Sequence, residues 1–365
     1  MFMAPVTRRI PVRLHLTNVT GAGASQLLLS LLPALERDSK FSIEKIHLPE
    51  RGVLSSYQNL TPSSVLEVYN RRLPNALSRV VECTLAASDF NGDSPLLVLG
   101  DLPLRCRGPQ TVFVQQSNLL IPKKLEVGAV GLKYWIARAI FRFNLDRARA
   151  FIVQTDVMRE FLERSYSGVA GRVHVISQPV PSWLLYSGLC RKARAQPNLE
   201  RLRLIYPAAG YPHKNHVLLS RLDLDAAWPI EELILTLSET THPAPQLSWV
   251  NCVGFLSPVQ MIEAYSKVDA LLFLSKEESY GFPLLEAMFV GLPIVCPDLP
   301  YGHALCGDNA IYFDPDNSES LLGALRTLQT RLQQGWWPNW EDRLLNVPKD
   351  WETVARRMLE VTCGA

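Results

Sequence analysis

The sequence predicts an α/β protein built from two doubly wound, Rossmann-like domains that face each other across a cleft. Three observations predict this class. The chain has 365 residues, of which 47% are hydrophobic, enough for more than one core. Short runs of Val, Ile and Leu alternate with longer helix-like stretches, a pattern typical of parallel strands covered by helices on both faces. The pattern lapses once near the middle of the chain and then resumes, as expected for a linker between two domains.

The alternation gives nine strand predictions, each a short apolar run bounded by polar or turn-forming residues. They lie at residues 12–16, 96–99, 111–114, 150–153, 173–176, 202–206, 232–237, 270–273 and 293–296. A final helix is expected from Trp351, because Trp351, Val354, Met358 and Val361 would share one face.

These elements set the expected domain boundaries. Residues 1–185 form the first domain and residues 201–345 the second. Residues 186–200 contain Gly188, a run of basic residues and a proline but no apolar periodicity, and they are the predicted linker. Residues 346–365 hold the final helix.

Composition excludes several classes of protein. A net charge of +2, without a basic tail, is too small to indicate a nucleic-acid partner. Seven cysteines, an odd number without a Cys-x-x-Cys pair, argue against a disulfide scaffold or a zinc knuckle and favour a reducing compartment. No apolar run suits a signal peptide or reaches the roughly 18 residues of a membrane span. We therefore expect a cytoplasmic protein.

A strand-to-helix transition in the second domain carries the strongest signal. Glu278 and Glu286 are separated by seven residues across it. Between them, Gly281 can adopt backbone angles that other residues avoid, and Pro283 suits the first turn of a helix. The amides of residues 281–284 at that helix start would attract a diphosphate. An acid before the turn can then reach a sugar, and one in the first helical turns can reach a ribose.

The segment Glu278-Ser-Tyr-Gly-Phe-Pro-Leu-Leu-Glu286-Ala-Met, followed by Gly291-Leu-Pro-Ile-Val, resembles the Glu-x7-Glu signature of the retaining glycosyltransferases of family four, the group 1 glycosyltransferases. Residues 253–275 and 307–316 are also family-like. The first glutamate of that family contacts hydroxyls of the donor sugar and the second holds the ribose hydroxyls of the nucleotide. The resemblance assigns these contacts to Glu278 and Glu286.

The resemblance covers most of residues 201–330 and implies the GT-B fold, in which the final helix, here residues 346–365, crosses back to the first domain. It also implies that the whole turn lines the donor site. The expected donor contacts from this turn are Glu278, Ser279, Tyr280, Gly281, Phe282, Pro283 and Glu286.

Lys214 follows the strand at residues 202–206, in a loop that resembles the first loop of the family's donor domain. The lysine of that loop neutralises the diphosphate leaving group, so the resemblance makes Lys214 and Glu278 the catalytic residues, with Asn215 as a further donor contact. Tyr211 stands where relatives commonly carry an arginine. Either Lys214 carries the leaving-group charge with fewer helpers, or a cation from elsewhere assists.

The first domain supplies the expected acceptor side. Its first strand runs into a loop with Gly21 and Gly23 that opens a leucine-rich helix, although the third glycine of a dinucleotide fingerprint is missing. GT-B enzymes have a glycine loop at the corresponding place, so we expect Gly23 to contact the donor and Gly21 to lie on the acceptor side. The family often has a histidine at the end of a first-domain strand. Here Gln115 and Gln116 follow residues 111–114, and a glutamine can only exchange hydrogen bonds.

Two Asp-x-Asp patterns, at residues 223–225 and 314–316, raise the question of a metal. Both fall in turn-like segments, and Lys214 with a helix dipole already supplies positive charge. We expect no metal and no other cofactor.

Residues 123–149 hold seven basic residues and two acidic ones, interleaved with aromatic and aliphatic side chains. The basic residues are Lys123, Lys124, Lys133, Arg138, Arg142, Arg147 and Arg149. A basic amphipathic helix of this kind can lie on an anionic membrane surface. The alternative is an ordinary helix with a buried stripe and solvated charges.

These features predict a retaining hexosyltransferase that moves a sugar from a UDP- or GDP-sugar to a glycan or lipid-linked acceptor. The expected setting is cell-surface polysaccharide or lipopolysaccharide synthesis, in the cytoplasm or peripherally on the inner face of the plasma membrane. Two alternatives remain. One is a sugar-nucleotide epimerase on the same fold. The other is a non-catalytic sugar-nucleotide-binding subunit that scaffolds polysaccharide assembly, which Tyr211 and the Gln115-Gln116 pair favour.

Overall fold

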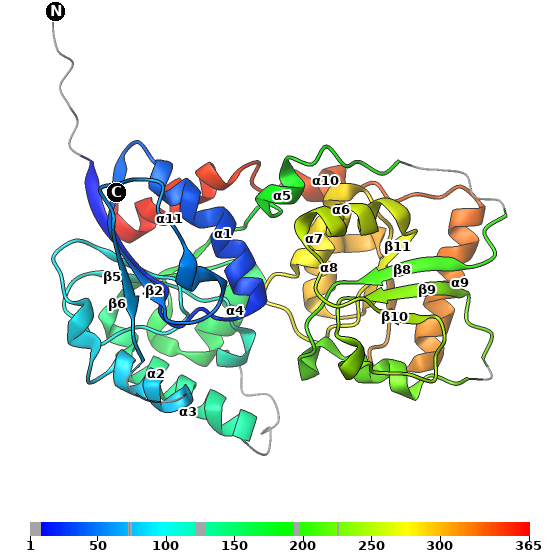
Figure 1. Cartoon of the computed structure of the whole chain (residues 1–365), viewed down its shortest axis with the longest axis horizontal. Helices are drawn as coiled ribbons and strands as arrows, with labels where there is room; N and C mark the ends of the chain where they lie inside the picture. Colours follow the sequence, from blue (N-terminus) through cyan, green and yellow to red (C-terminus); the bar gives the residue numbers. More distant parts are fainter. Residues whose placement is uncertain (1–8, 72, 74, 121–128, 193–197, 225) are drawn as a thin grey trace, which may run out of the picture. The chain divides into compact units, whose positions relative to one another are not determined.

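The computed structural model in Figure 1 describes residues 9–71, 73, 75–120, 129–192, 198–224 and 226–365. The chain divides into two compact units, one made of Met1–Pro179 with Pro348–Ala365 and the other of Val180–Val347. Each unit contains one parallel sheet with helices packed on it. The prediction of two doubly wound, Rossmann-like domains is therefore confirmed.

The first unit has a seven-stranded sheet in the order β3-β2-β1-β4-β5-β6-β7, and every pairing is parallel. The strands are β1 (Ile10–His15), β2 (Phe41–Pro49), β3 (Val65–Tyr69), β4 (Leu96–Val98), β5 (Gln110–Phe113), β6 (Ala148–Val153) and β7 (Val173–Val175). The order reverses between β1 and β4. Such a switch point is where ligands collect, at the carboxyl ends of the strands.

The helices of the first unit are α1 (Ala22–Arg37), α2 (Asn75–Cys83), α3 (Ala129–Asn144), α4 (Asp156–Ser165) and α11 (Trp351–Cys363). Helix α11 packs against α1 and strands β4 to β6, far from its neighbours in sequence (Figure 1). Trp351, Val354 and Met358 are buried on one face, as predicted, while Val361 is only partly buried. The last helix is thus part of the first unit.

The second unit has a six-stranded parallel sheet in the order β10-β9-β8-β11-β12-β13. Its strands are β8 (Leu202–Tyr206), β9 (Ile230–Leu235), β10 (Val250–Cys252), β11 (Ala270–Leu272), β12 (Ile294–Pro297) and β13 (Ile311–Phe313). Its helices are α5 (Ser182–Leu185), α6 (Pro258–Lys267), α7 (Phe282–Val290), α8 (Pro300–Cys306), α9 (Ser318–Gln333) and α10 (Glu341–Leu344). Here the switch point lies between β8 and β11.

The boundary between the units falls earlier than the predicted linker at residues 186–200. Val180 and Leu184 are buried in the core of the second unit. The Arg191 amide donates to the carbonyl of Val290 over 2.6 Å. The described part of the predicted linker therefore packs on the second unit, because its backbone polar groups find partners there; residues 193–197 lie outside the described residues.

Four strands of the described structure were not predicted. Strand β2 interleaves charged residues with apolar ones, and β3 is an edge strand with largely exposed side chains. Strands β10 and β13 have three residues each, too few for a periodicity to appear. In the described part of the chain, every helix is too short or too polar to cross a bilayer.

Candidate functional site

Two loops meet at the switch point of the second sheet. One follows β8 and carries Lys214, and the other follows β11 and carries Glu278. The Lys214 Nζ lies 2.5 Å from the Glu278 Oε1. The side chains are 16% and 10% exposed, respectively, so water screens this ion pair only in part. The two predicted catalytic residues, which are 64 positions apart in sequence, are brought together.

The two loops are also joined through their backbones. The amide of Lys276 donates to the carbonyl of His213 over 2.8 Å, and the Ser275 hydroxyl donates to the same carbonyl over 3.3 Å. Buried Tyr206, the last residue of β8, donates its hydroxyl hydrogen to the Lys214 carbonyl over 2.8 Å. These bonds fix the position of the lysine relative to the β11 loop before any ligand binds.

Helix α7 begins directly after this loop. Gly281 precedes the helix with φ +84°, and an added Cβ would meet Leu284 and Leu305 at 3.3 Å, so a glycine is required there. The Leu284 amide donates to the Gly281 carbonyl, and Pro283 has no N–H. Residues 281–284 were predicted to bind a diphosphate through their backbone amides. The amides of Gly281 and Phe282 therefore remain for that role.

Glu286 lies in the second turn of α7 and is 8% exposed. Its Oε2 accepts a hydrogen bond from the hydroxyl of Tyr265 on α6, with 2.8 Å between the oxygens. Burial raises the pKa of Glu286 to about 7, and the Tyr265 hydrogen bond opposes part of this increase. Tyr265 was not among the predicted site residues. Its only signal was its position on an apolar helix face within the family-like segment at residues 253–275.

The remaining residues that were predicted to contact the donor differ in how deeply they are buried. Tyr280 is 3% exposed and its ring packs edge-on against Phe282, 5.0 Å between centroids, so it belongs to the core. Asn215 is 3% exposed, adopts a left-handed backbone with φ +56°, and donates from Nδ2 to the Pro315 carbonyl. Tyr280 and Asn215 therefore hold the two loops in place from the protein interior. Ser279 is partly exposed and lies next to Glu278.

His216 follows the Lys214 loop and is 8% exposed. Burial lowers its pKa to about 4, with the nearby charge of Lys214 adding to the effect. Its ring lies against that of Tyr206, 5.0 Å between centroids. A neutral, packed imidazole at this place supports the loop and leaves the cationic role to Lys214.

The carboxylates of the Asp-x-Asp pattern at residues 314–316 interact with other groups of the protein. Asp316 forms an ion pair with Lys276, and Asp314 accepts a hydrogen bond from the Asp316 amide. Asp223 belongs to the other pattern, whose Asp225 lies outside the described residues. Asp314 thus serves the local turn, and Asp316 joins that turn to the loop after β11.

Glu239, His242 and Cys252 form a further cluster in the second unit, with potential ligand atoms within 4.8 Å of one another. Both ring nitrogens of His242 are engaged, however. Its Nε2 lies 3.2 Å from the Val250 carbonyl, and its Nδ1 accepts from the Ala244 amide. The histidine therefore has no lone pair left for a cation.

In the first unit, the residues predicted to line the site follow strands β1 and β5, which β4 separates in the sheet. Gly21 and Gly23 are exposed at the start of α1, and an added Cβ at either would meet nothing within 4 Å. Gln115 and Gln116 follow β5, and both of their amides donate to the Asp101 Oδ1, at 2.6 and 3.1 Å. Asp101 has φ +70°, a strained conformation for a non-glycine residue. Nothing in the sequence indicates this anchor.

The two glutamine side chains differ. Gln115 donates from Nε2 to the carbonyl of Leu99 over 3.1 Å and is held by the backbone. Gln116 lies beside the Tyr134 hydroxyl, 3.5 Å from Nε2, on the wall of a pocket. Of the pair, Gln116 is the one whose amide faces open space.

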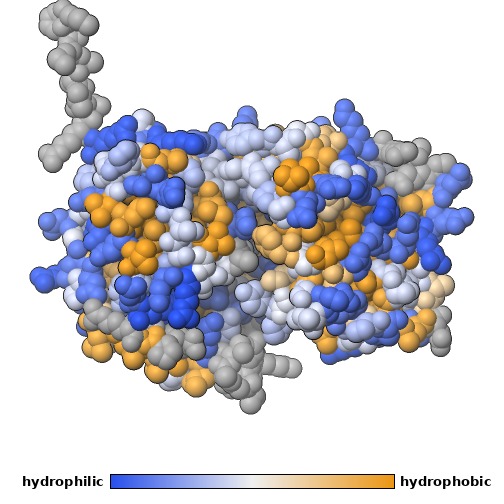
Figure 2. All heavy atoms as spheres, in the orientation of Figure 1, coloured by the Kyte–Doolittle hydropathy of each residue, from blue (hydrophilic) through white to orange (hydrophobic). Residues whose placement is uncertain are grey.

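Helix α3 covers part of the basic segment at residues 123–149, of which residues 123–128 lie outside the described residues. Its inner face buries Ile140, Phe141 and Asn144. Its outer face exposes Leu132, Trp135 and Phe143 by 59%, 64% and 60%. Figure 2 shows hydrophobic side chains over the end of the unit where α2 and α3 lie. The helix therefore has apolar side chains on both faces, more than an ordinary core-covering helix needs.

The fold as a whole has counterparts among solved glycosyltransferases. WaaG, a glycosyltransferase involved in lipopolysaccharide biosynthesis, matches with a TM-score of 0.66 at 14% identity, covering 97% of this chain and 100% of WaaG. HepE of Anabaena, solved with UDP-glucose, matches with a TM-score of 0.61 at 14% identity, covering 98% and 100%. Residues 236–331 match the family model of the group 1 glycosyl transferases. The chain has the GT-B fold, and its second unit contains a segment similar to the group 1 glycosyl transferases.

The matched part of this group 1 domain includes Tyr265, Glu278 and Glu286. RfbU, an O-antigen chain mannosyltransferase of Salmonella typhimurium strain LT2, is 22% identical over 209 residues, which are 53% of this chain and 56% of RfbU. The chain thus spans little more than half the length of that relative.

Proposed function

We propose that the protein transfers a hexose from a nucleotide diphosphate sugar, UDP- or GDP-linked, to a glycan or lipid-linked acceptor with retention of configuration. The observation that carries the proposal is the Lys214–Glu278 pair beside the start of α7, with Glu286 in the second turn of that helix. The group 1 match supports transfer. The resemblance of the segment from Glu278 to Glu286 to the retaining family supports retention.

The names of the relatives support a role in cell-surface polysaccharide or lipopolysaccharide synthesis. RfbU is an O-antigen chain mannosyltransferase and WaaG acts in lipopolysaccharide biosynthesis. The mannosyl relative favours a GDP-sugar, whereas the HepE complex contains UDP-glucose, so the donor panel must contain both.

In the proposed reaction the diphosphate leaves the anomeric carbon while an acceptor hydroxyl attacks, through an oxocarbenium-like state. Lys214 and the amides of Gly281 and Phe282 hold the leaving charge. Glu278 orients the sugar and Glu286 accepts the ribose hydroxyls. The ammonium of Lys214 has three hydrogens, so it can keep its bond to Glu278 and still donate to a phosphate.

The same charges make a metal unnecessary in this proposal. An ammonium group and a helix start supply the positive charge that a divalent cation supplies elsewhere. Activity is expected to survive EDTA, and an absolute dependence on Mg²⁺ or Mn²⁺ would contradict this part.

On the acceptor side, the bare backbone at Gly21 and Gly23 admits a ligand, and Gln116 can bind a hydroxyl but cannot remove its proton. The outer face of α3 suits peripheral contact with the anionic inner face of the plasma membrane, since Trp135 and Phe143 can enter the headgroup region beside basic side chains. We propose that the reaction takes place in the cytoplasm, at the membrane surface.

The test is a thermal-shift panel of UDP-, GDP- and ADP-sugars, followed by transfer assays with the donor that binds. Glu286→Ala should abolish the shift caused by that donor. An isomerised donor in the absence of acceptor would favour an epimerase. A donor that binds without transfer or hydrolysis would favour the scaffold alternative. If no nucleotide sugar changes the melting temperature, the proposal is wrong.

A further inference from the structure

Asp101 is the central residue of a tight turn in the loop that follows β4 of the first unit. The Leu102 amide donates to the Gly100 carbonyl over 2.9 Å, and φ of Asp101 is +70°. A hydrogen bond that spans one residue of positive φ is typical of the γ-turn that is rare and strained. An asparagine or a glycine would adopt this backbone at a lower cost. The reason for an aspartate must therefore lie in its side chain.

The carboxylate of Asp101 uses one of its two oxygens to hold the neighbouring loop. Its Oδ1 accepts hydrogen bonds from the amides of Gln115 and Gln116, at 2.6 and 3.1 Å. Within the part of the chain that the structure describes, Oδ2 has no hydrogen-bond partner, and it is not closed off from solvent. An oxygen that is held in place and has free lone pairs can accept a hydrogen bond from a ligand.

The turn itself does not need the negative charge of Asp101. An asparagine carbonyl could accept the same two amides, and burying a carboxylate costs more free energy than burying a neutral amide. Burial raises the pKa of Asp101, while the hydrogen bond from the Gln115 amide and the charge of Arg79 on α2 oppose part of this increase. A carboxylate with a raised pKa is a stronger base than an exposed one. Only an aspartate therefore supplies a basic oxygen at this position of the turn.

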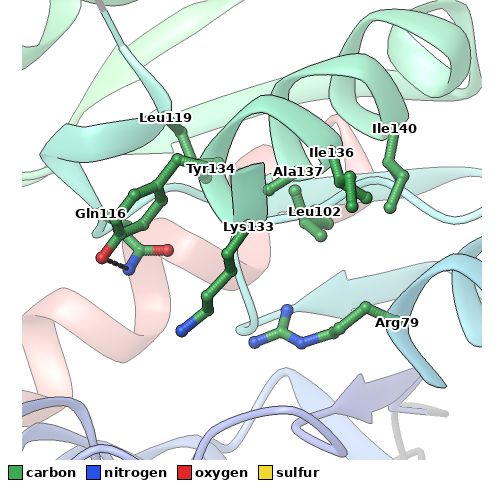
Figure 3. A pocket seen from close by; sticks show the side chains of 9 residues that line it. All are labelled: Arg79, Leu102, Gln116, Leu119, Lys133, Tyr134, Ile136, Ala137 and Ile140. Carbon is green, nitrogen blue, oxygen red and sulfur yellow. Dashed lines mark hydrogen bonds between the residues drawn. The ribbon is translucent and has the colours of Figure 1, made fainter. Parts of the chain in front are cut away.

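The turn joins the loops that carry the predicted acceptor-side residues. Strand β4 lies between β1 and β5, at the switch point of the sheet. Buried Asn18, from the loop after β1, donates from Nδ2 to the Gly100 carbonyl over 2.7 Å. In the loop after β5, Gln116 gives its amide to Asp101 and turns its side chain toward the hydroxyl of Tyr134 on α3 (Figure 3). Asp101 is thus fixed at the edge of the sheet where ligands of such folds collect.

We propose that Asp101 is the base of the acceptor side, and that its Oδ2 accepts a hydrogen bond from the attacking hydroxyl and takes up the proton. The hydroxyl oxygen forms its bond to the anomeric carbon while the bond from that carbon to the diphosphate breaks. The electron pair of the broken bond leaves with the diphosphate, and the proton passes to Oδ2 and later to water. Gln115 and Gln116 cannot perform this step, because an amide side chain is not a base. The inference rests on the proposed transferase function and names a catalytic residue for it.

The test measures hydrolysis of the donor by the full chain, because water then takes the place of the acceptor hydroxyl and needs the same base. GDP-mannose and UDP-glucose are the two donors, and the release of GDP or UDP is followed. Asp101→Asn keeps an oxygen for the two amides and suits the positive φ, so its melting temperature should change little. Its kcat for hydrolysis should fall about 100-fold, a usual contribution of a general base. The shift in melting temperature that the donor causes should stay as in the wild type.

Asp38→Asn is the matched control in the first unit. The Oδ1 of Asp38 also accepts two backbone amides, from Lys40 and Phe41, but its Oδ2 is paired with Arg356. This variant should therefore lose stability and keep its kcat, the reverse of Asp101→Asn.

Two results would overturn the assignment of Asp101 alone. One is hydrolysis by Asp101→Asn at the rate of the wild type. The other is loss of the donor-induced shift together with kcat, since Asp101 would then act through the fold. A wild type that hydrolyses neither donor would instead count against the transferase proposal and the base together.

Discussion

Tyr265 donates its hydroxyl hydrogen to Glu286, with 2.8 Å between Oη and Oε2, and both side chains are buried. This bond occupies one carboxylate oxygen and leaves the other for a ligand. It also favours the ionised form of a carboxyl group whose pKa burial raises to about 7. Tyr265 thus acts on the proposed donor site through Glu286, as a positioning residue.

Tyr265→Phe should raise the donor KM about 10-fold with a smaller change in kcat, because the carboxylate loses the hydrogen bond that orients it and favours its charge. The pH at which half the donor affinity is lost should also move upward. Steady-state kinetics between pH 6 and 9 check both. Tyr312→Phe is the control, since that hydroxyl bonds to backbone carbonyls elsewhere in the unit. An unchanged pH profile would show that Tyr265 only fills space.

Glu286→Gln should change the pH dependence of folding stability. The folded-state pKa of about 7 exceeds the ordinary value of 4.5, so the folded protein binds the proton more tightly. The stability contributed by this group is full below pH 4.5 and is lost as the pH rises to about 7. Glutamine has no proton to lose. Above pH 7, the free energy of unfolding of the variant should therefore exceed that of the wild type by up to about 3 kcal/mol. Urea unfolding at pH 5 and pH 8 measures this. A difference in unfolding free energy between the two proteins that does not change with pH would contradict the ionisation assigned to Glu286.

Lys214→Ala should lower kcat about 100-fold and affect donor KM much less, because leaving-group charge develops mainly in the transition state. Lys267→Ala, which removes an exposed lysine paired with Glu263 on α6, is the matched control. Equal activity of the two variants would rule out Lys214 as the group that stabilises the leaving diphosphate.

Gly23→Ala should separate stability from activity. Nothing lies within 4 Å of an added Cβ, and the residue is in the first turn of α1, so the variant should keep or gain about 0.5–1 kcal/mol of stability. Donor or acceptor KM should nevertheless rise if a ligand approaches that backbone. Gly281→Ala should instead destabilise the protein by about 1–2 kcal/mol, because φ is +84° there. Thermal melts with parallel activity assays test both; full activity in Gly23→Ala would remove Gly23 from the site.

The sequence predicted those parts of the site that depend on local order. Lys214 and Glu278 follow strands with strong apolar runs, and parallel strands end at one edge of a sheet, so their meeting follows once β8 and β11 are neighbours. The turn at Gly281 could also be predicted, because the residues that form it are consecutive in the sequence.

Contacts between distant elements could not be predicted in this way. The bond from Tyr265 to Glu286 depends on how α6 and α7 lie on the sheet, and neither residue signals the other across 21 positions. Asp101 was missed because its strained backbone and its two amide partners appear only when β4 and β5 pair. The boundary at residue 180 was missed because a segment with irregular sequence still packs when its backbone finds partners.

The return of α11 to the first unit makes residues 180–347 an insertion within that unit. A ribosome must therefore finish the whole insertion before Trp351, Val354 and Met358 are available to complete the first core. At about 5–20 residues per second, the nascent first unit waits roughly 10–30 s with its α11-facing apolar surface uncovered. During that interval the surface is open to chaperones or to aggregation, and removing the codons of α11 would harm the unit whose other strands and helices are encoded before the insertion.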